Sequence, residues 1–455
     1  MAMVWGRRKA LGPLTEAGAR QTADNLGVRL GYADAPGVAI GRTVAGGRRL
    51  YGSYEDMHVD IWGPRQGKTT RRVIPAILDA VGPVVATATG REVLDATRDC
   101  RYGKGSRVWV FDPDGVAGER PDWCWDPLAW VRGDEARAAR LAGHFADADR
   151  RLDATDYFEI EGEELLAALF LAASLARFPI TQVWEWVTNP MDTEAVQVLR
   201  CAERHHASAG VAALYNLDER TKSGIFGTAR KMARCLRFPN LHPWVCHTGE
   251  QYRLDATEIV DENATLYLLS APGRGTAVPV VNAFLDAVLD AARPSRIPML
   301  AVLDDAADVV RSRDFPQRCG RYGADGVVVM AMLQSWAQGV RCWGPGGMSE
   351  LWSAANIRVL GGGVDDVPLL RDGVDRASVA AVRSLPRGRA VLLASGVPPV
   401  PIEVEPWWEG PHADDVRASI RAHGRRRTTI DDLIEFQEAD MVLSSGSESA
   451  DTGEP

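Results

Sequence analysis

A glycine-containing turn between a predicted strand and a predicted helix constrains the fold of this chain more than any other feature. The turn has the sequence Ile61-Trp62-Gly63-Pro64-Arg65-Gln66-Gly67-Lys68-Thr69-Thr70. It follows an alternating segment at 57–61, which predicts a strand, and precedes a helix-forming segment at 71–78. A strand, a glycine turn ending in Gly-Lys-Thr and a helix form the layout of a phosphate-binding P-loop. Glycines let successive amide groups face one anion, and the helix N-terminus adds a favourable dipole.

Each residue type in this turn suits a chemical task. Lys68 is expected to reach the β- and γ-phosphates of ATP, and the Thr69 hydroxyl is expected to ligate Mg²⁺. The turn is one residue shorter than usual, since three residues separate Gly63 from Gly67, and Trp62 occupies the place of the outer glycine. The flanking strand and helix weigh against the alternative, a chance Gly-Lys-Thr in an ordinary turn. The predicted phosphate-binding residues are Gly63, Pro64, Arg65, Gln66, Gly67, Lys68, Thr69 and Thr70.

Other apolar, β-branched runs recur along the chain with helical stretches between them. This alternation predicts an α/β fold with a mostly parallel central sheet. The last two runs are separated by Gly396-Val397-Pro398-Pro399, which predicts a hairpin-like turn. The strands expected after the first, at 57–62, are 83–89, 107–112, 264–270, 299–303, 327–333, 357–360, 389–395 and 400–404.

The chain has 455 residues, too many for one hydrophobic core. Residues 136–247 show helical periodicity and no convincing strand, and a crossover between two strands needs far fewer residues. We therefore expect an inserted all-α domain at 136–247, within a nucleotide-binding domain formed by 48–135 and 248–410. Residues 1–47 form an N-terminal segment. Residues 411–455 are expected to form a short helix at 414–423, a second at 431–440 and a disordered acidic tail.

Composition narrows the functional classes. Apolar residues make up 46% of the chain and charged residues 25%, as in soluble globular proteins. A net charge of −9 argues against a DNA-coating protein but leaves room for a local basic channel. The most apolar helix-like run, 165–176, is about twelve residues long, too short to span a bilayer, and the first residues lack the apolar core of a signal peptide. A soluble, cytoplasmic protein is expected.

Seven cysteines are scattered without CxxC spacing, which favours a reducing compartment and free, mostly buried thiols. The pairs Cys246-His247 and His205-His206 offer metal-ligating atoms, but neither has a second pair at suitable spacing. Packing or surface roles are the better interpretation of both.

Paired carboxylates follow the predicted strand at 299–303. A P-loop enzyme needs such an acid at the end of a neighbouring strand, and by position Asp304 is expected to hold Mg²⁺ through water. Asp305 is expected to orient the attacking water, a task that falls to Glu in most such ATPases. The side chain of Asp is one methylene shorter, and small misplacements at a reacting centre are costly, so slow hydrolysis is one expectation. The alternative is that the pair only caps the following helix.

Two further polar residues are candidate catalytic groups. Gln334 ends the predicted strand at 327–333, where a side chain can sense the γ-phosphate. Arg321 precedes this strand and is a candidate arginine finger for a neighbouring subunit, because its planar guanidinium spreads charge over phosphoryl oxygens. An ordinary surface arginine is the alternative.

Several motifs in one order make a family resemblance specific. The chain resembles the conjugative coupling ATPases of the TraG/TraD kind, in their actinobacterial form, from about residue 55 to 400. The resemblance implies a RecA-like P-loop fold with an inserted all-α domain, ATP and Mg²⁺ as cofactors, and a homo-hexameric ring. It assigns phosphate and Mg²⁺ to Lys68 and Thr69, the metal and hydrolysis acids to Asp304 and Asp305, and the sensor to Gln334. The motifs are Gly63-Pro64-Arg65-Gln66-Gly67-Lys68-Thr69-Thr70, Val84-Val85-Ala86-Thr87-Ala88-Thr89, Phe111-Asp112-Pro113-Asp114-Gly115, Leu303-Asp304-Asp305-Ala306-Ala307, Arg321-Tyr322-Gly323 and Leu333-Gln334-Ser335-Trp336-Ala337-Gln338.

By this resemblance the protein is expected to drive DNA or protein-bound DNA into a type IV secretion channel. Its expected partners are sequence-independent DNA and the relaxosome or other substrate proteins, which the all-α domain of the family recognises. Family members usually carry transmembrane helices, so a separate membrane-anchor subunit and a peripheral place at the inner face of the membrane are expected. Arg71, Arg72, Arg230 and Lys231 are candidate contacts to the DNA backbone.

Two other functions stay open. One is an FtsK/HerA-like translocase for other DNA or for protein export, which would not need the helical insert. The other is a weakly hydrolysing ATP-binding adaptor that recruits secretion substrates through its helices.

Overall fold

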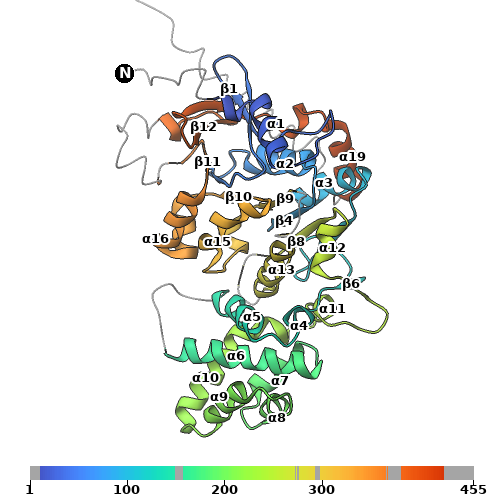
Figure 1. Ribbon diagram of the computed structural model, residues 1–455, viewed down its shortest axis with the longest axis vertical. Coiled ribbons are helices and arrows are strands. Elements are labelled where there is room, and N and C mark those ends of the chain that lie inside the picture. Colours follow the sequence, from blue (N-terminus) through green and yellow to red (C-terminus); the bar gives the residue numbers. More distant parts are fainter. Residues whose placement is uncertain are drawn as a thin grey trace, which may run out of the picture.

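The computed structural model describes residues 11–148, 157–271, 273, 276–292, 298–364, 366 and 381–424. Among these residues, one eleven-stranded sheet forms the centre of the upper part of the molecule (Figure 1). The strands from β11 to β5 run parallel, and β2, β1, β13 and β12 extend the sheet with antiparallel pairing. In spatial order they are β2 (Arg49–Gly52), β1 (Val38–Thr43), β13 (Val400–Glu403), β12 (Arg389–Ala394), β11 (Ile357–Gly361), β3 (His58–Ile61), β10 (Val327–Leu333), β9 (Met299–Leu303), β4 (Val84–Ala88), β8 (Thr265–Leu269) and β5 (Val108–Phe111).

The mostly parallel sheet expected from the sequence is confirmed, and each expected strand is present to within about two residues at its ends. The hairpin-like turn is also present, because β12 and β13 pair antiparallel. Two strands of the main sheet were missed, as were the two short strands β6 (Trp123–Cys124) and β7 (Tyr252–Arg253) of a separate pair. β1 and β2 precede the P-loop strand, and β1 joins the main sheet through β13. An irregular register between Ala39 and Gly41 interrupts the alternation of β1, which hid it from pattern reasoning.

Alternate residues of the strands face two different layers of helices. Val328, Met330 and Met332 of β10 share a core with α2 (Ile74–Asp79) and α3 (Glu92–Gly103). Val327, Val329 and Ala331 belong instead to the core that contains α13 (Val278–Ala292). The period of two along a strand therefore places α2 and α3 on one face of the sheet and α13 on the other.

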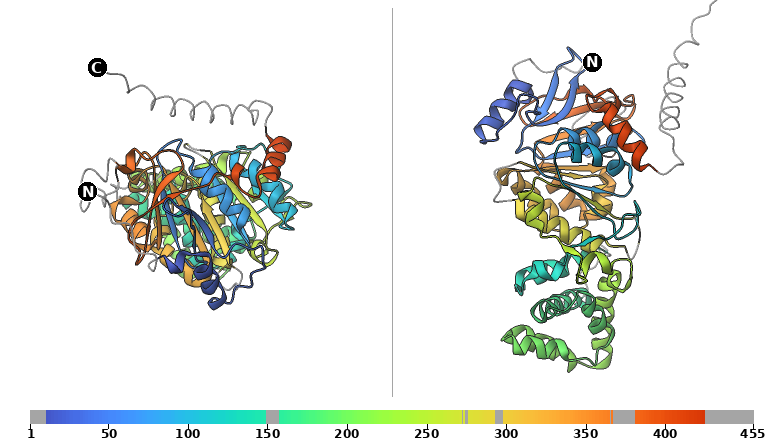
Figure 2. Two further views of the ribbon diagram at one scale, coloured as in Figure 1. Left: turned by 90° about the horizontal axis from the view of Figure 1, so that it is seen from above. Right: turned by 90° about the vertical axis from the view of Figure 1, so that its right-hand side faces the viewer.

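The described residues between 136 and 247 form helices and no strand, as the sequence predicted. These helices lie below the sheet, beyond α13 (Figure 1), and the side view shows them continuing along the long axis (Figure 2). The insertion comprises α5 (Glu135–Asp147), α6 (Tyr157–Ala176), α7 (Thr181–Thr188), α8 (Glu194–Cys201), α9 (His205–Tyr215), α10 (Glu219–Met232), the short 3-10 helix η3 (Ala233–Arg237) and α11 (His242–Val245).

The chain passes between the sheet and the insertion twice, and a short pair of parallel strands connects these two segments. β6 (Trp123–Cys124) pairs with β7 (Tyr252–Arg253), and Trp125 N donates to Trp244 O at 2.9 Å. Aromatic rings fill this neck, where Trp125 stacks on Phe284 of α13 with ring centroids 4.5 Å apart. Such large buried rings hold the insertion against α13.

Most of the remaining helices cover the sheet and its edges, while α4 (Pro127–Val131) packs on α5, α6 and α13 below it. Residues 413–423 form a helix close to the expected bounds, and it packs on α3. The expected helix at 431–440, the acidic tail, Arg425-Arg426-Arg427 and the first ten residues lie outside the described residues. The helices are α1 (Glu16–Asn25), α4 (Pro127–Val131), α12 (Ala256–Asp261), α14 (Ala306–Val309), α15 (Phe315–Tyr322), α16 (Trp336–Ala354) and α19 (Ala413–His423).

Within the described ranges, every helix is too short or too polar to cross a bilayer. The seven cysteines are free, but only Cys124, Cys235 and Cys319 are buried, so the expectation of mostly buried thiols was wrong. The same ranges contain no group of three or more His, Cys, Asp or Glu side chains that could hold a metal ion.

Candidate nucleotide-binding site

The order of the strands brings the predicted site residues to one edge of the sheet. β3 leads into the P-loop and lies between β10 and β11. Gln334 follows β10, the carboxylates Asp304 and Asp305 follow β9, and Gly362 follows β11. Because parallel strands end at the same edge, all of these residues surround the turn at 63–70.

The P-loop turn depends on two left-handed backbone positions. Arg65 has φ 60° and Gly67 has φ 88°, so only Gly67 adopts this conformation without steric cost. The chain then enters a π-helical turn, Thr69–Val73, before α2. Single π turns are frequent at functional sites, and the first turn of a helix leaves its amide groups free to bind an anion.

A glycine triplet that sequence reasoning missed supports the shortened loop. Gly63 N donates to Gly362 O at 3.0 Å. A Cβ on Gly63 would lie 2.8 Å from that oxygen, and a Cβ on Gly361 would overlap the indole of Trp62. Trp62 is fully buried against this segment. The absence of side chains at 361–363 therefore lets the turn after β11 lie directly against the P-loop.

Lys68 forms an ion pair with both predicted acids. Its Nζ lies 2.8 Å from Asp304 Oδ1 and 2.6 Å from Asp305 Oδ1, and its side chain is 11% exposed. Burial by itself lowers the pKa of Lys68, but the two carboxylates outweigh burial and hold it above the ordinary value. Burial likewise raises the pKa of Asp305, but Lys68 and the hydrogen bonds from Thr89 and Gln334 hold it below the ordinary value. Lys68 and Asp305 are therefore both charged at neutral pH.

The Thr69 hydroxyl donates to Asp304 Oδ2 at 2.9 Å. A hydroxyl and a buried carboxylate side by side are the hard oxygen donors that Mg²⁺ prefers, with phosphate oxygens and water completing its shell. One carboxylate suffices for such a site, so the absence of a larger acidic cluster in the described ranges does not conflict with it. The donor set fits Mg²⁺.

Asp305 accepts hydrogen bonds from two further residues besides Lys68. Gln334 Nε2 donates to Asp305 Oδ1 at 3.3 Å, and Thr89 Oγ1 donates to Oδ2 at 2.7 Å. Thr89 follows β4, the strand beside β9, and no role was expected for it, although it ends the family motif at 84–89. The charges of Asp304 and Asp305 also act on Glu92: burial and these two charges raise its pKa.

Arg321 is not among the residues gathered around Lys68. It lies exposed at the end of α15, before β10 begins, and lines a cavity with Asp286 and Asp290. The amino end of β10 is at the edge of the sheet opposite the P-loop. A contact of Arg321 with phosphate therefore requires a neighbouring subunit.

One of the expected DNA contacts, Arg72, was wrong. Arg72 is 1% exposed and pairs with Asp60 of β3 at 2.7 Å. Arg71 donates through Nη1 to Val404 O at 2.5 Å and lies over the Trp408 ring. Arg72 therefore cannot reach DNA, whereas Arg71 is half-buried and keeps part of its side chain exposed. Arg230 and Lys231 are exposed on α10.

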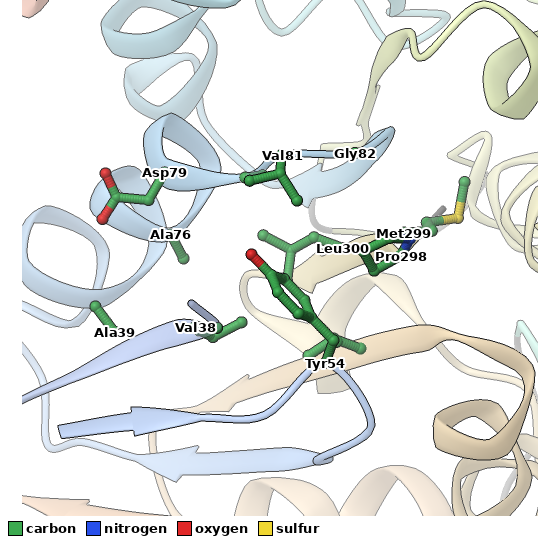
Figure 3. Close-up of a pocket in the computed structure, with 13 residues that line it drawn as sticks. Val38, Ala39, Tyr54, Ala76, Asp79, Val81, Gly82, Pro298, Met299 and Leu300 are labelled. Carbon is green, nitrogen blue, oxygen red and sulfur yellow. The ribbon is translucent and has the colours of Figure 1, made fainter. Parts of the chain in front are cut away.

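A small apolar pocket lies at the opposite edge of the sheet. Figure 3 shows the Tyr54 ring beside Leu300 at the start of β9. Tyr54 OH donates to Ala35 O at 2.6 Å. The pocket has no charged side chain except Asp79 and is separate from the P-loop.

Comparisons with known proteins identify a family and a similar fold. The family model described as "Type IV secretory system Conjugative DNA transfer" matches residues 17–293. A second, described as "TraM recognition site of TraD and TraG", matches residues 298–381. No curated protein matches the chain at the level of sequence.

Among solved structures, the chain is similar in fold to the plasmid coupling protein TrwB. The complex of TrwB with the non-hydrolysable GTP analogue GDPNP has a TM-score of 0.54 and 14% identity, and the match covers 86% of this chain and 92% of TrwB. The complex with the ATP analogue ADPNP gives the same four values. The sulphate complex gives 0.53 and 15%, with the same coverage.

Proposed function

The chain belongs to the type IV secretory system family of conjugative DNA transfer, and on this basis we propose that it is a Mg²⁺-dependent ATPase that drives DNA into a secretion channel. The observation that carries the proposal is the placement of Lys68 within 2.8 Å of Asp304 and 2.6 Å of Asp305 at the end of the P-loop strand. Structures of TrwB with nucleotide analogues support a nucleotide at the same place in the fold.

Each residue of the site has a separate role in the proposed reaction. The amides of the first helical turn and Gly67 face the phosphates, and Lys68 leaves its carboxylate partners to pair with the β- and γ-phosphates. Thr69 and Asp304 hold Mg²⁺, which supplies charge neutralisation on the phosphate oxygens. Asp305, freed from Lys68, orients the attacking water, and Gln334 reports the γ-phosphate. Arg321 acts on the site of the next subunit in a homo-hexameric ring.

The partners follow from the family and the site. DNA is bound through its phosphate backbone, independent of sequence. A relaxosome protein is a partner, since residues 298–381 match a TraM recognition site. The protein works on the cytoplasmic side of the membrane, where its nucleotide and DNA are, and a separate subunit anchors it there.

Slow turnover is the second candidate behaviour, and a specific observation favours it. Lys68, Thr89 and Gln334 all donate hydrogen bonds to Asp305. These bonds restrict the movement of a side chain that is already one methylene shorter than Glu. An ATP-binding adaptor would use the same fold with little hydrolysis.

Phosphate release with and without single-stranded or duplex DNA tests the proposal. A motor shows DNA-stimulated hydrolysis that Lys68→Ala abolishes, while the surface variant Arg220→Ala behaves as the parent. Nucleotide binding without turnover supports the adaptor instead. Turnover indifferent to DNA supports protein export.

A further inference from the structure

A chain of hydrogen bonds leads away from Asp305 to the far end of α14. Gln334 Nε2 donates to Asp305, and the backbone N–H of Gln334 donates to Gln338 Oε1 at 2.9 Å. Gln338 Nε2 in turn donates to Asp308 Oδ2 at 3.0 Å. Gln338 is 9% exposed, so water does not compete freely for these bonds.

Asp308 lines a cavity between the ATPase sheet and the helical insertion. The insertion contributes Lys231 and Arg234, and the segment after α14 contributes Arg311. The start of α13, at Val278, closes another side, and Figure 1 shows α13 lying between the sheet and the insertion. Among the described lining residues, Lys231 and Arg311 beside the single carboxylate of Asp308 give this part of the cavity an excess of positive charge.

The size and charge of the cavity restrict what enters it. Its volume is about 20 Å³, which is room for roughly one water-sized group. A phosphate oxygen fits this space, and a nucleobase does not. Guanidinium and ammonium groups recognise that oxygen whatever the base sequence.

We propose that this cavity, lined by Lys231, Arg234, Arg311 and Asp308, binds a backbone phosphate of the translocated DNA strand and is linked to Asp305 through Gln338. A phosphate beside Lys231 and Arg311 changes the charge balance around Asp308, and Gln338 transmits the change to Gln334. The charges of Asp305 and Lys68 already act on the pKa of Asp308, which burial and Asp305 raise and Arg311 and Lys68 lower. This inference rests on the proposed function, since it names the DNA contact of the same machine.

The binding half is tested with a fluorescein-labelled oligo(dT) 20-mer and fluorescence anisotropy over a range of salt concentrations. Lys231→Ala is expected to weaken binding severalfold and to reduce the magnitude of the log–log salt slope by about 0.7, the loss of one single-strand phosphate contact. Arg220→Ala removes the same charge from the other end of α10 and is expected to keep the slope of the parent. Equal slopes for Lys231→Ala and the parent overturn the proposal. Displacement of the oligonucleotide by poly-glutamate at equal charge would assign the cavity to an acidic peptide and also overturn it.

The linkage half is tested by the ratio of DNA affinities with and without a non-hydrolysable ATP analogue. In the parent this ratio is expected to be about fivefold or more, within the usual range of coupling. Gln338→Met keeps the length of the side chain and removes both hydrogen bonds, so the ratio is expected to fall to about one. A ratio equal to that of the parent overturns the linkage, and a merely structural role of Gln338 would not abolish the ratio selectively.

The two proposals fail in distinguishable ways. If Lys68→Ala abolishes DNA-stimulated turnover while Lys231→Ala binds DNA as the parent does, the ATPase stands and the cavity proposal falls. If Lys68→Ala turns over ATP as the parent does, the proposed function falls whatever the affinities show.

Discussion

Lys68 Nζ lies 2.6 Å from Asp305 Oδ1, so the residue expected to bind phosphate is paired with the residue expected to orient water. Phosphate must compete with two carboxylates for this ammonium group. Once Lys68 turns to the phosphates, Asp305 loses its strongest partner and gains freedom to bind water. In the proposed function, the pair would therefore tie nucleotide binding to the availability of the acid that orients water.

Asp305→Asn should separate binding from hydrolysis. The amide keeps the size of the side chain but cannot accept a proton or polarise water, so we expect ATP turnover to fall at least about 100-fold. Affinity for a fluorescent ATP analogue should stay within severalfold of the parent. Asp261→Asn, an exposed acid on α12, is the control and should retain full turnover. Turnover of Asp305→Asn within about threefold of the parent would contradict the role given to Asp305.

Gly63→Ala should damage the P-loop without unfolding the protein. The added Cβ would lie 2.8 Å from Gly362 O and 2.9 Å from Gly363 Cα, so the loop must move away from the turn after β11. We expect at least a tenfold loss of nucleotide affinity, measured by analogue titration, with a melting temperature within a few degrees of the parent. Gly103→Ala is the matched control, because its Cβ meets nothing within 4 Å. Equal affinities for the two variants would show that the glycine contact is dispensable.

Arg72→Ala should destabilise the fold. The change leaves Asp60 as an unpaired charge with no exposed surface, and we expect a loss of about 3–5 kcal/mol in unfolding free energy. Chemical denaturation measures it. The double variant Asp60→Leu with Arg72→Met removes both charges and should recover a large part of that loss. A double variant less stable than Arg72→Ala would mean that the pair does more than satisfy its own charges.

Asp147 should make stability fall with rising pH. Burial raises its pKa to about 6, with Glu163 adding to the effect and Arg313 and His144 opposing it. A carboxyl whose folded pKa lies above the unfolded value stabilises the fold most below about pH 4, and this contribution is lost as the pH rises through 6. Relative to Asp147→Asn, the parent should therefore lose about 2 kcal/mol between pH 4.5 and 8. A pH-independent difference between the two unfolding free energies would contradict this assignment.

Some of the site was accessible to sequence reasoning because it depends on local order along the chain. The glycine turn, the Asp304–Asp305 pair and Gln334 each follow an apolar strand, and a strand end is recognisable from a short window. Thr89 and the triplet at 361–363 follow strands as well, but nothing in their own windows shows that they lie beside the P-loop. They become part of the site only through the strand order.

Arg72 shows the opposite limit. From the sequence it is one of two basic residues at a helix start, equally suited to solvent or to DNA. In the folded protein, the side chain of Arg72 contacts Asp60 of β3, and the two residues form a buried ion pair. The charge of a residue therefore does not predict whether its side chain faces solvent or the protein interior.

The sequence by itself determined the alternation of strands and helices, the phosphate-binding turn and the helical insertion, because periodicity and glycine placement act over a few residues. The tertiary structure decided which strand ends meet, that Lys68 pairs with Asp304 and Asp305, and that Gln338 connects them to a basic cavity. Those outcomes depend on contacts between residues that are between 29 and 237 positions apart. Only the order and register of the strands in the folded sheet specify them.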